Sequence, residues 1–186
     1  MPPKQKYTRE IILNKSYEIF ASQGMDAVNA RSVSAELGCS TQPIFSYFPD
    51  MESLRRSLSQ KAVNDFMSAV NDAETQELSL ESIYTAYVLF AARNRFVFLH
   101  MTQLADEMIV HPFDVILDSI EKVIPSVCRC YTLNEDAARN ACQEIATYAH
   151  GLACILAAHP ESFPASDVSE EIRRVSKFFY LGAQPK

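Results

Sequence analysis

A short segment with closely spaced polar and aromatic side chains has the residue types that recognise base edges in nucleic acids. It covers residues 37–48 and reads LGCSTQPIFSYF. The amide of Gln42 can form two hydrogen bonds with one adenine edge, and the hydroxyls of Thr41 and Ser46 can bond to bases or phosphates. The hydroxyl of Tyr47 can reach a phosphate. These side chains predict contact with double-stranded DNA.

A short helix is needed to present these side chains together. We expect Ser40 to cap it and Pro43 to lie in its first turn, where the missing N–H of proline costs nothing and its ring can contact a thymine methyl group. Ile44, Phe45 and Phe48 follow at i, i+1 and i+4 and are expected to pack inward. The remaining side chains would then face outward.

Two helices are expected before this one and a long helix after it. The first covers residues 8–22, with Thr8 as its N-cap, and the second begins after the cap Asn29 and stops at Gly38. Asp50 then caps a fourth helix, over residues 51–72. A helix, a tight turn and a short second helix form the layout that places a helix end in the major groove, although a generic helical hairpin would show the same pattern.

Composition favours a helical fold with an uneven charge distribution. The chain has 186 residues, 48% of them hydrophobic, and only four glycines, so an all-α fold of about nine helices is expected. Residues 1–61 carry eight basic and six acidic groups, a net charge of +2, whereas residues 62–186 carry nine and seventeen, a net charge of −8. This asymmetry is typical of a DNA-facing head on an acidic body.

No pattern in the sequence indicates catalysis. A glycine-rich phosphate loop, a nucleophile elbow and an HExxH motif are all missing, and no two of the four histidines have the i, i+4 spacing of a zinc site. The five cysteines lack regular spacing and are interpreted as free thiols. We therefore expect no enzyme activity, no cofactor and no metal. A membrane span and a signal peptide are also not indicated, so a cytoplasmic protein, associated with the nucleoid when bound to DNA, is expected.

Residues 8–58 resemble the DNA-binding domain of the tetracycline-repressor (TetR) family of bacterial transcription regulators. The resemblance is carried, in the family's order and spacing, by Thr8–Ile12, Phe20–Gly24, Arg31–Ser34, Leu37–Ser40, Ile44–Phe48 and Glu52–Leu54. It implies a helix-turn-helix at about residues 30–49, in a DNA-binding domain over residues 1–50. It also implies DNA contacts by Arg31, Ser40, Thr41, Gln42, Pro43, Ser46 and Tyr47, with Ser40 capping the recognition helix.

The chain departs from the family pattern at two positions. Family members often carry a basic residue just after the capping serine, where this chain has Thr41. A lysine is usual at the start of the fourth helix, where this chain has Met51. Lys4, Lys6 and Arg9, together with backbone N–H groups at the start of the fourth helix, are the alternative sources of phosphate contacts.

Residues 51–186 are expected to form a helical regulatory and dimerisation domain. A nearly all-apolar helix over residues 78–99 is interrupted at 93–95, and Pro112 and Pro125 bracket another over 113–124, which can continue past Pro125 with a kink. In the resembling family the middle helices hold a small-molecule effector. The candidate lining residues, each of which could also be ordinary core, are Phe90, Phe96, Phe98, Met101, Leu104, Met108, Phe113, Ile116, Leu117 and Tyr148.

The last two helices are candidates for a homodimer interface. A helix rich in small residues should run from Asn134 to about Ala158, and a last one should begin after Ser166 or Asp167. In the resembling family the last two helices of each subunit form a four-helix interface. The expected contact residues are Ala146, Ala149, Ala153, Ala157, Ile172, Val175 and Phe179.

Together these features predict a dimeric DNA-binding regulator of a pseudo-palindromic operator. The favoured form is a repressor released by a small apolar or amphipathic ligand. Two alternatives stay open: a regulator that is controlled by a protein partner or acts as an activator, and a helical dimeric interaction protein that does not bind DNA.

Overall fold

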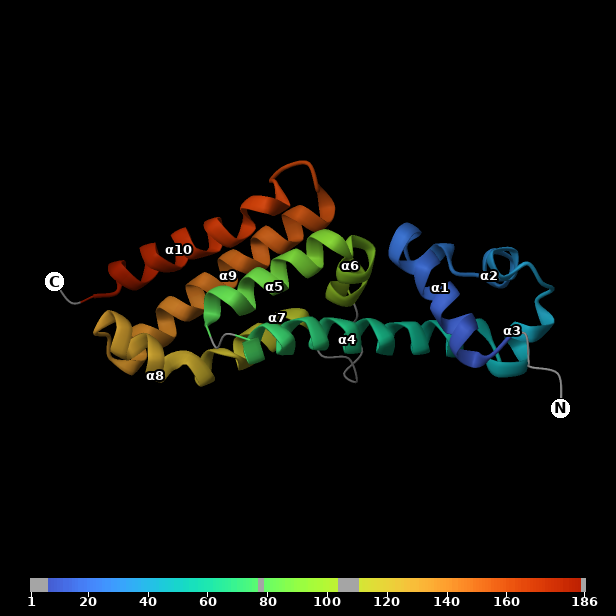
Figure 1. The fold of residues 1–186 in the computed structure, drawn as a ribbon, viewed down its shortest axis with the longest axis horizontal. Helices are drawn as coiled ribbons and strands as arrows, with labels where there is room; N and C mark the ends of the chain where they lie inside the picture. The colour runs from blue at the N-terminus through green and yellow to red at the C-terminus, as the bar shows by residue number, and fades with distance from the viewer. Residues whose placement is uncertain (1–6, 77–78, 104–110, 185–186) are drawn as a thin grey trace.

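The computed structural model describes residues 7–76, 79–103 and 111–184, with side chains of 74–76 excepted, and it is all-α over these ranges. Ten α-helices and two short 3₁₀-helices make up the described residues, without a β-strand. Figure 1 shows helices α1 to α3 at one end, here called the head (residues 7–50), and the remaining helices as an elongated body. Among the described residues, no helix is long and apolar enough to cross a membrane.

The first two helices of the head begin and end where their capping residues place them. Helix α1 spans Arg9–Gln23, and its Ile11 N–H donates to the Thr8 hydroxyl at 3.2 Å. A short 3₁₀-helix, η1, follows at Met25–Ala27. Helix α2 spans Ala30–Leu37, is capped by Asn29, and ends at Gly38, whose φ of 62° lies in the left-handed region. The caps predicted for both helices are confirmed.

Helix α3 spans Gln42–Tyr47 and corrects two expectations. Ser40 does not cap it: the first helical carbonyl is that of Thr41, which accepts from Ile44 N–H at 3.1 Å, so Ser40 lies one residue too early. Phe45 does not pack inward and is 45% exposed. The reason is geometric, because a two-turn helix has one buried face, which the i, i+4 pair Ile44 and Phe48 occupies.

Helix α4, Met51–Gln76, connects the head to the body. The Asp50 carboxylate accepts the Ser53 N–H at 2.7 Å, so the predicted cap is confirmed. Helix α5 spans Leu80–Arg93 and α6 spans Arg95–Gln103, and the predicted interruption falls at Asn94, between them.

The helix expected between Pro112 and Pro125 consists of two helices. Helix α7 spans Pro112–Asp118 and α8 spans Ile120–Tyr131, with Pro125 inside α8. The break falls at Ser119, whose hydroxyl donates to the Val115 carbonyl at 3.2 Å and so competes with the helical pattern. The boundary placed at Pro125 was wrong, and the continuation of a helix past that proline is confirmed.

Two long helices complete the body. Helix α9 spans Glu135–Ala158 with Asn134 as its cap, as predicted. A 3₁₀-turn, η2 (Ala165–Asp167), leads into α10, Val168–Gly182. Asp167 is the N-cap of α10, but its side chain makes no capping bond and instead accepts from the Ser166 hydroxyl at 2.7 Å.

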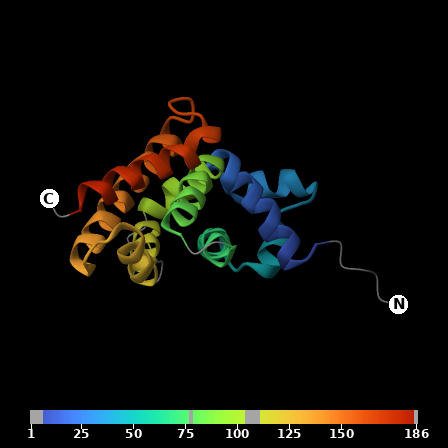
Figure 2. The same ribbon diagram turned by 60° about the vertical axis from the view of Figure 1, so that its left-hand side comes forward.

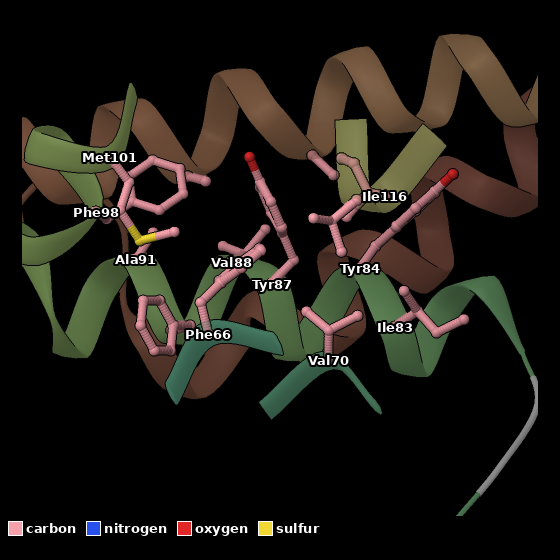
Figure 3. Packing of buried hydrophobic residues seen from close by; sticks show 14 of the residues in the cluster. Phe66, Val70, Ile83, Tyr84, Tyr87, Val88, Ala91, Phe98, Met101 and Ile116 are labelled. Carbon is pink, nitrogen blue, oxygen red and sulfur yellow. The ribbon is translucent and has the colours of Figure 1, made fainter. Parts of the chain in front are cut away.

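Helix α5 lies at the centre of the body and contacts α4 on one side and α9 and α10 on the other (Figures 1 and 2). Its buried face includes Tyr84 and Tyr87, both fully enclosed (Figure 3). The buried hydroxyls have partners, since Tyr84 donates to the Cys142 carbonyl at 3.3 Å and Tyr87 bonds to His150 Nδ1 at 2.7 Å. Large buried aromatic residues therefore join α5 to α9 through packing and hydrogen bonds together.

Candidate nucleic-acid interface

The outer face of α3 combines exposed polar side chains with one exposed aromatic ring. Thr41, Gln42 and Ser46 are exposed and Pro43 is half-buried. The Ser46 hydroxyl donates to the Gln42 carbonyl at 3.0 Å, so its oxygen keeps acceptor capacity toward a donor outside the chain. Phe45, which sequence reasoning placed in the core, extends this face with an apolar ring. Its position next to Ile44 was the available signal, because adjacent residues on a helix point in different directions.

Tyr47 is held by the start of α1 and does not project freely. It is half-buried, and its hydroxyl donates to the Tyr7 carbonyl at 3.0 Å. The hydroxyl oxygen still has lone pairs for an external donor, but the proton is committed to Tyr7. The position therefore fixes α3 against the beginning of α1.

Arg31 and Ser40 flank the α3 face and are both exposed. Arg31 lies in the first turn of α2, and its side chain has no hydrogen bond or ion pair with any described residue. Its guanidinium group is free to form two hydrogen bonds with a phosphate or a guanine edge. The structure thus places Arg31, Ser40, Thr41, Gln42 and Ser46 on the head surface.

Other basic residues of the head and of the start of α4 make contacts within the chain. Arg9 donates to the Ser57 hydroxyl at 3.0 Å and lies 4.8 Å from the Phe48 ring centroid. Arg55 donates to the Val28 carbonyl at 3.0 Å, and Arg56 pairs with Glu52 at 3.1 Å. Lys4 and Lys6, expected to supply phosphate contacts, lie outside the described residues. The cations near α3 therefore stabilise the head as well as adding positive charge to it.

Residues 12–58 match the sequence model of bacterial regulatory proteins of the tetR family. This range contains α2, α3 and the start of α4, and the exposed face described above lies within it.

This chain carries the N-terminal domain of the TetR family.

Two solved structures are similar to this chain over nearly its whole length. A protein of unknown function from Rhodococcus sp. RHA1 has a TM-score of 0.73 at 19% identity, covering 99% of this chain and 100% of its own. A transcriptional regulator from the same organism has a TM-score of 0.62 at 12% identity, covering 95% and 97%. At these identities the likeness shows a shared fold. No curated protein sequence matches the chain.

A joint between the TetR-type head and the body is built around His100 of α6. Its Nε2 lies 3.0 Å from the Ser59 hydroxyl of α4, and its ring meets Phe20 of α1 edge-on with centroids 5.2 Å apart. Burial lowers the pKa of His100, an effect that nearby Asp26 partly opposes. At the same joint, a Cβ added to Gly24, which has a φ of +91°, would meet the Phe96 ring at 3.5 Å. Three helices therefore meet at one half-buried imidazole.

The residues predicted to line an effector pocket are spread over the core and its edge. Phe98, Met101 and Ile116 are fully buried in the hydrophobic cluster (Figure 3). Phe96, Phe113, Leu117 and Tyr148 are half-buried, while Leu104 and Met108 lie outside the described residues. Phe90 alone among the described members lines the groove between α4, α5 and α10.

Tyr148 and Phe113 make polar or aromatic contacts of their own. Tyr148 donates a short hydrogen bond to Glu171, and its pKa is raised to about 12 by burial and this carboxylate. The Phe113 ring lies against the His150 ring at a tilt of 45°, with centroids 4.9 Å apart. Contacts of this kind occur in packing between helices as well as around a bound ligand.

Most residues predicted for the dimer interface are enclosed within one subunit. Five of them are fully buried: Ala146, Ala149, Ala153, Ala157 and Ile172. Val175 is 6% exposed and Phe179 is half-buried. The small residues let α9 pack closely against α5 and α10 of the same chain. The dimer itself stays a prediction.

The sequence analysis did not predict which apolar residues of α9 and α10 are exposed. Ile155 is 50% exposed, Phe178 71% and Leu181 48%. On α10 the buried stripe is Val168, Ile172 and Val175, at i, i+4 and i+7. Phe178 and Leu181 follow this stripe and are three residues apart. Large apolar residues at that spacing were the signal in the sequence for a second apolar face.

Proposed function

We propose that this TetR-family transcriptional regulator binds a pseudo-palindromic DNA operator as a homodimer, with α3 of each subunit in the major groove. The observation that carries the proposal is the division of α3 into two faces. Ile44 and Phe48 are buried beneath it, and Thr41, Gln42 and Ser46 are exposed above it. A helix fixed on one side with hydrogen-bonding groups on the other has what base readout needs.

Gln42 is the residue we assign to base recognition. It is the first residue of α3, and recognition helices contact bases mainly through their N-terminal part. Its side chain has no hydrogen-bond partner among the described residues, so both amide groups are available to an adenine edge. Arg31 and the backbone N–H groups at the start of α4 then supply phosphate contacts.

Dimerisation is supported by the exposed apolar residues of the last two helices. Ile155, Phe178 and Leu181 expose apolar side chains that a monomer would leave in water. A two-fold interface would cover these side chains on both subunits, and a dimer carries two recognition helices to half-sites about 34–36 Å apart. Because α3 holds no basic residue, two linked heads also compensate for modest affinity of each one.

We propose repression as the mode of action, with release by a small amphipathic ligand. A dimer on an operator blocks polymerase, and a ligand that prefers another head geometry lowers DNA affinity. A 100-fold preference corresponds to about 2.7 kcal/mol of coupling. The following experiment separates this proposal from activation and from an interaction protein without DNA binding; control by a protein partner is a further alternative.

Selection of bound duplexes from a random pool, followed by footprinting, tests this function. We expect enrichment of an inverted repeat whose half-site centres are about 10 base pairs apart, or a multiple of that spacing, with protection of both half-sites. Recovery of unselected sequence at every salt concentration would contradict DNA readout. Transcription in vitro from a promoter overlapping the selected site then separates repression from activation.

A further inference from the structure

A groove of about 1200 Å³ runs along the side of α5 that faces away from the core. Its floor is one stripe of α5 with four side chains at i, i+4, i+7 and i+11: Ser82, Ala86, Leu89 and Arg93. Helix α4 forms one wall and α10 the other. Small side chains line the groove and leave room in it, among them Ala69 and Ala73 of α4 and Ser169 of α10.

The end of this groove near the head carries positive charge without a partner. Arg93 of α5 and Arg173 of α10 both line it, and neither has a hydrogen bond or ion pair with any described residue. Figure 1 shows α10 beginning beside the end of α5 that faces the head. The acidic residue from α4, Asp65, is already neutralised by Lys61 at 3.2 Å.

The other acidic residue of the groove lies toward its far end. Glu81 is in the first turn of α5 and, with Tyr131, also lines a smaller hollow of about 170 Å³ against α8. The groove is therefore polarised, with free guanidinium groups toward the head and a carboxylate toward α8. Between them, Leu89 and Phe90 supply apolar surface.

We propose that this groove is the effector site and that it takes a small amphipathic anion, with an acidic group on Arg93 and Arg173 and an apolar body on Leu89 and Phe90. The inference rests on the proposed function, because it assigns the ligand that releases DNA. Guanidinium groups bind carboxylates, sulfonates and phosphates through paired hydrogen bonds. An apolar wall with a few convergent polar groups is the usual composition of a small-molecule site.

The groove also touches the head, which gives a route from occupancy to DNA binding. Tyr17 of α1 lines it, and the Lys61 ammonium lies 4.8 Å from the Tyr17 ring centroid. The walls thus belong partly to the head and partly to the body, so the shape of the groove changes when the head turns. A ligand that fills it binds one head orientation better than others and shifts the population toward that orientation.

Dimerisation through the exposed apolar face would leave the groove accessible. Phe178 and Ser169 are nine residues apart on α10, which places them roughly 180° apart around the helix at about 100° per residue. Arg173 is likewise turned by roughly 140° from Phe178. Phe178, the most exposed residue of the proposed dimer contact, therefore points away from the groove.

Fluorescence titration with two matched dyes tests the site. The probes are 1-anilinonaphthalene-8-sulfonate, an aromatic anion, and N-phenyl-1-naphthylamine, which has the same rings without the sulfonate. The chain has no tryptophan, so the dye signal stands on a low protein background. For Arg93→Gln/Arg173→Gln we expect a Kd for the anionic dye raised about tenfold, through loss of charge-assisted bonds, with little change for the neutral dye.

Two further variants make the result specific to the groove. Arg129→Gln removes an exposed charge on α8, outside the groove, and should leave both Kd values unchanged. Ala86→Phe fills the floor and should weaken both dyes. Equal anionic-dye binding by wild type and Arg93→Gln/Arg173→Gln would overturn the assignment. So would an Arg129→Gln variant whose affinity for the anionic dye falls as much as that of Arg93→Gln/Arg173→Gln. If Ala86→Phe fails to fold by circular dichroism, the arginine comparison decides alone.

DNA binding in the same samples separates this inference from the proposed function. With the selected duplex, the anionic dye should raise the Kd for DNA in wild type and not in Arg93→Gln/Arg173→Gln. DNA binding that the dye never alters overturns the effector site and leaves DNA readout standing. Arginine-dependent dye binding without any DNA binding contradicts the proposed function and supports the groove as a ligand site.

Discussion

At the scale of single residues, the α3 surface depends on hydrogen-bonding groups and one aromatic ring in place of charge. Gln42, Thr41 and Ser46 are exposed as the sequence predicted, because the burial of Ile44 and Phe48 fixes the orientation of the helix. Phe45 was predicted inward although it adjoins Ile44, and adjacent residues on a helix point in different directions, so the two could not share one buried face. The partner of Tyr47 was also hidden, because Tyr7 lies 40 residues away in the chain.

Tyr47→Phe should destabilise the head. The substitution removes the hydrogen bond to the Tyr7 carbonyl and leaves that part-buried acceptor without this donor. We expect a loss of about 0.5–1.5 kcal/mol in the free energy of unfolding, measured by urea denaturation. DNA affinity should fall by a similar factor on all sequences, because the change acts through the placement of α3. Unchanged stability would show that the tyrosine hydroxyl bonds elsewhere.

At the scale of elements, local signals predicted where most helices begin. Thr8, Asn29, Asp50 and Asn134 each accept a backbone N–H at the helix start that the sequence indicated. Capping is readable because it depends on residues within one turn. The expectations that failed are also local, because more than one residue can take the role: at the start of α3 the N-cap is Thr41 and not its neighbour Ser40. The break at Ser119 likewise reflects a side chain that competes for a carbonyl.

Asn29→Ala should weaken the start of α2 and with it the support of α3. The Asn29 side chain accepts from the N–H groups of Arg31 and Ser32 at 3.1 and 3.0 Å. The Asn29 N–H in turn donates to the Ser32 hydroxyl at 3.1 Å. Loss of the Asn29 side chain should lower the free energy of unfolding by about 1 kcal/mol, whereas Asn29→Asp, which keeps the acceptor and loses only the donor to the Ala27 carbonyl, should lose less. Equal losses in both variants would contradict the capping role.

Two of the half-buried histidines, His100 and His150, should make stability depend on pH. Burial lowers the pKa of His100 and of His150 below 6.5, with Asp26 opposing the shift at His100 and His111 adding to it at His150. The unfolded chain therefore binds protons at higher pH than the folded chain does. The stability due to each group is complete above pH 6.5 and is lost as the pH falls through the folded-state pKa.

Urea denaturation as a function of pH measures this effect. The free energy of unfolding should decrease as the pH falls below 6.5. His100→Gln should make this decrease less steep, because glutamine does not titrate, and its amide can still bond to Ser59. His159→Gln is the matched control, because His159 is exposed at the end of α9. A wild-type stability that rises on acidification in this range would contradict the assignment.

At the scale of the whole molecule, the fold links a DNA-facing head to a body with two further surfaces. One is the surface of α9 and α10 that carries the exposed apolar residues Ile155, Phe178 and Leu181, and the other is the groove along α5. The sequence predicted an all-α chain with a helix-turn-helix at one end because helical periodicity and caps are local. It did not place these surfaces, since each depends on which sides of three helices remain uncovered after packing.

Phe178→Asp should convert the dimer to a monomer. The substitution puts a charge at the most exposed apolar residue of α10, and burying an unpaired carboxylate in an interface is unfavourable. Sedimentation velocity should show a dimer for wild type and a mass near 20.9 kDa for the variant. Ser169→Asp, on the opposite side of the same helix, should stay dimeric. A wild-type monomer at micromolar concentration would contradict the interface.

Gln42 at the start of α3 offers the most direct test of DNA readout. We would measure fluorescence anisotropy of a labelled selected duplex with wild type, Gln42→Ala and Gln23→Ala, an exposed glutamine of α1 that serves as control. Loss of a two-bond base contact should weaken binding by about 1–3 kcal/mol per half-site, with reduced discrimination at one base pair, and the control should bind like wild type. Equal affinity and equal sequence preference for wild type and Gln42→Ala would contradict readout by this face of α3.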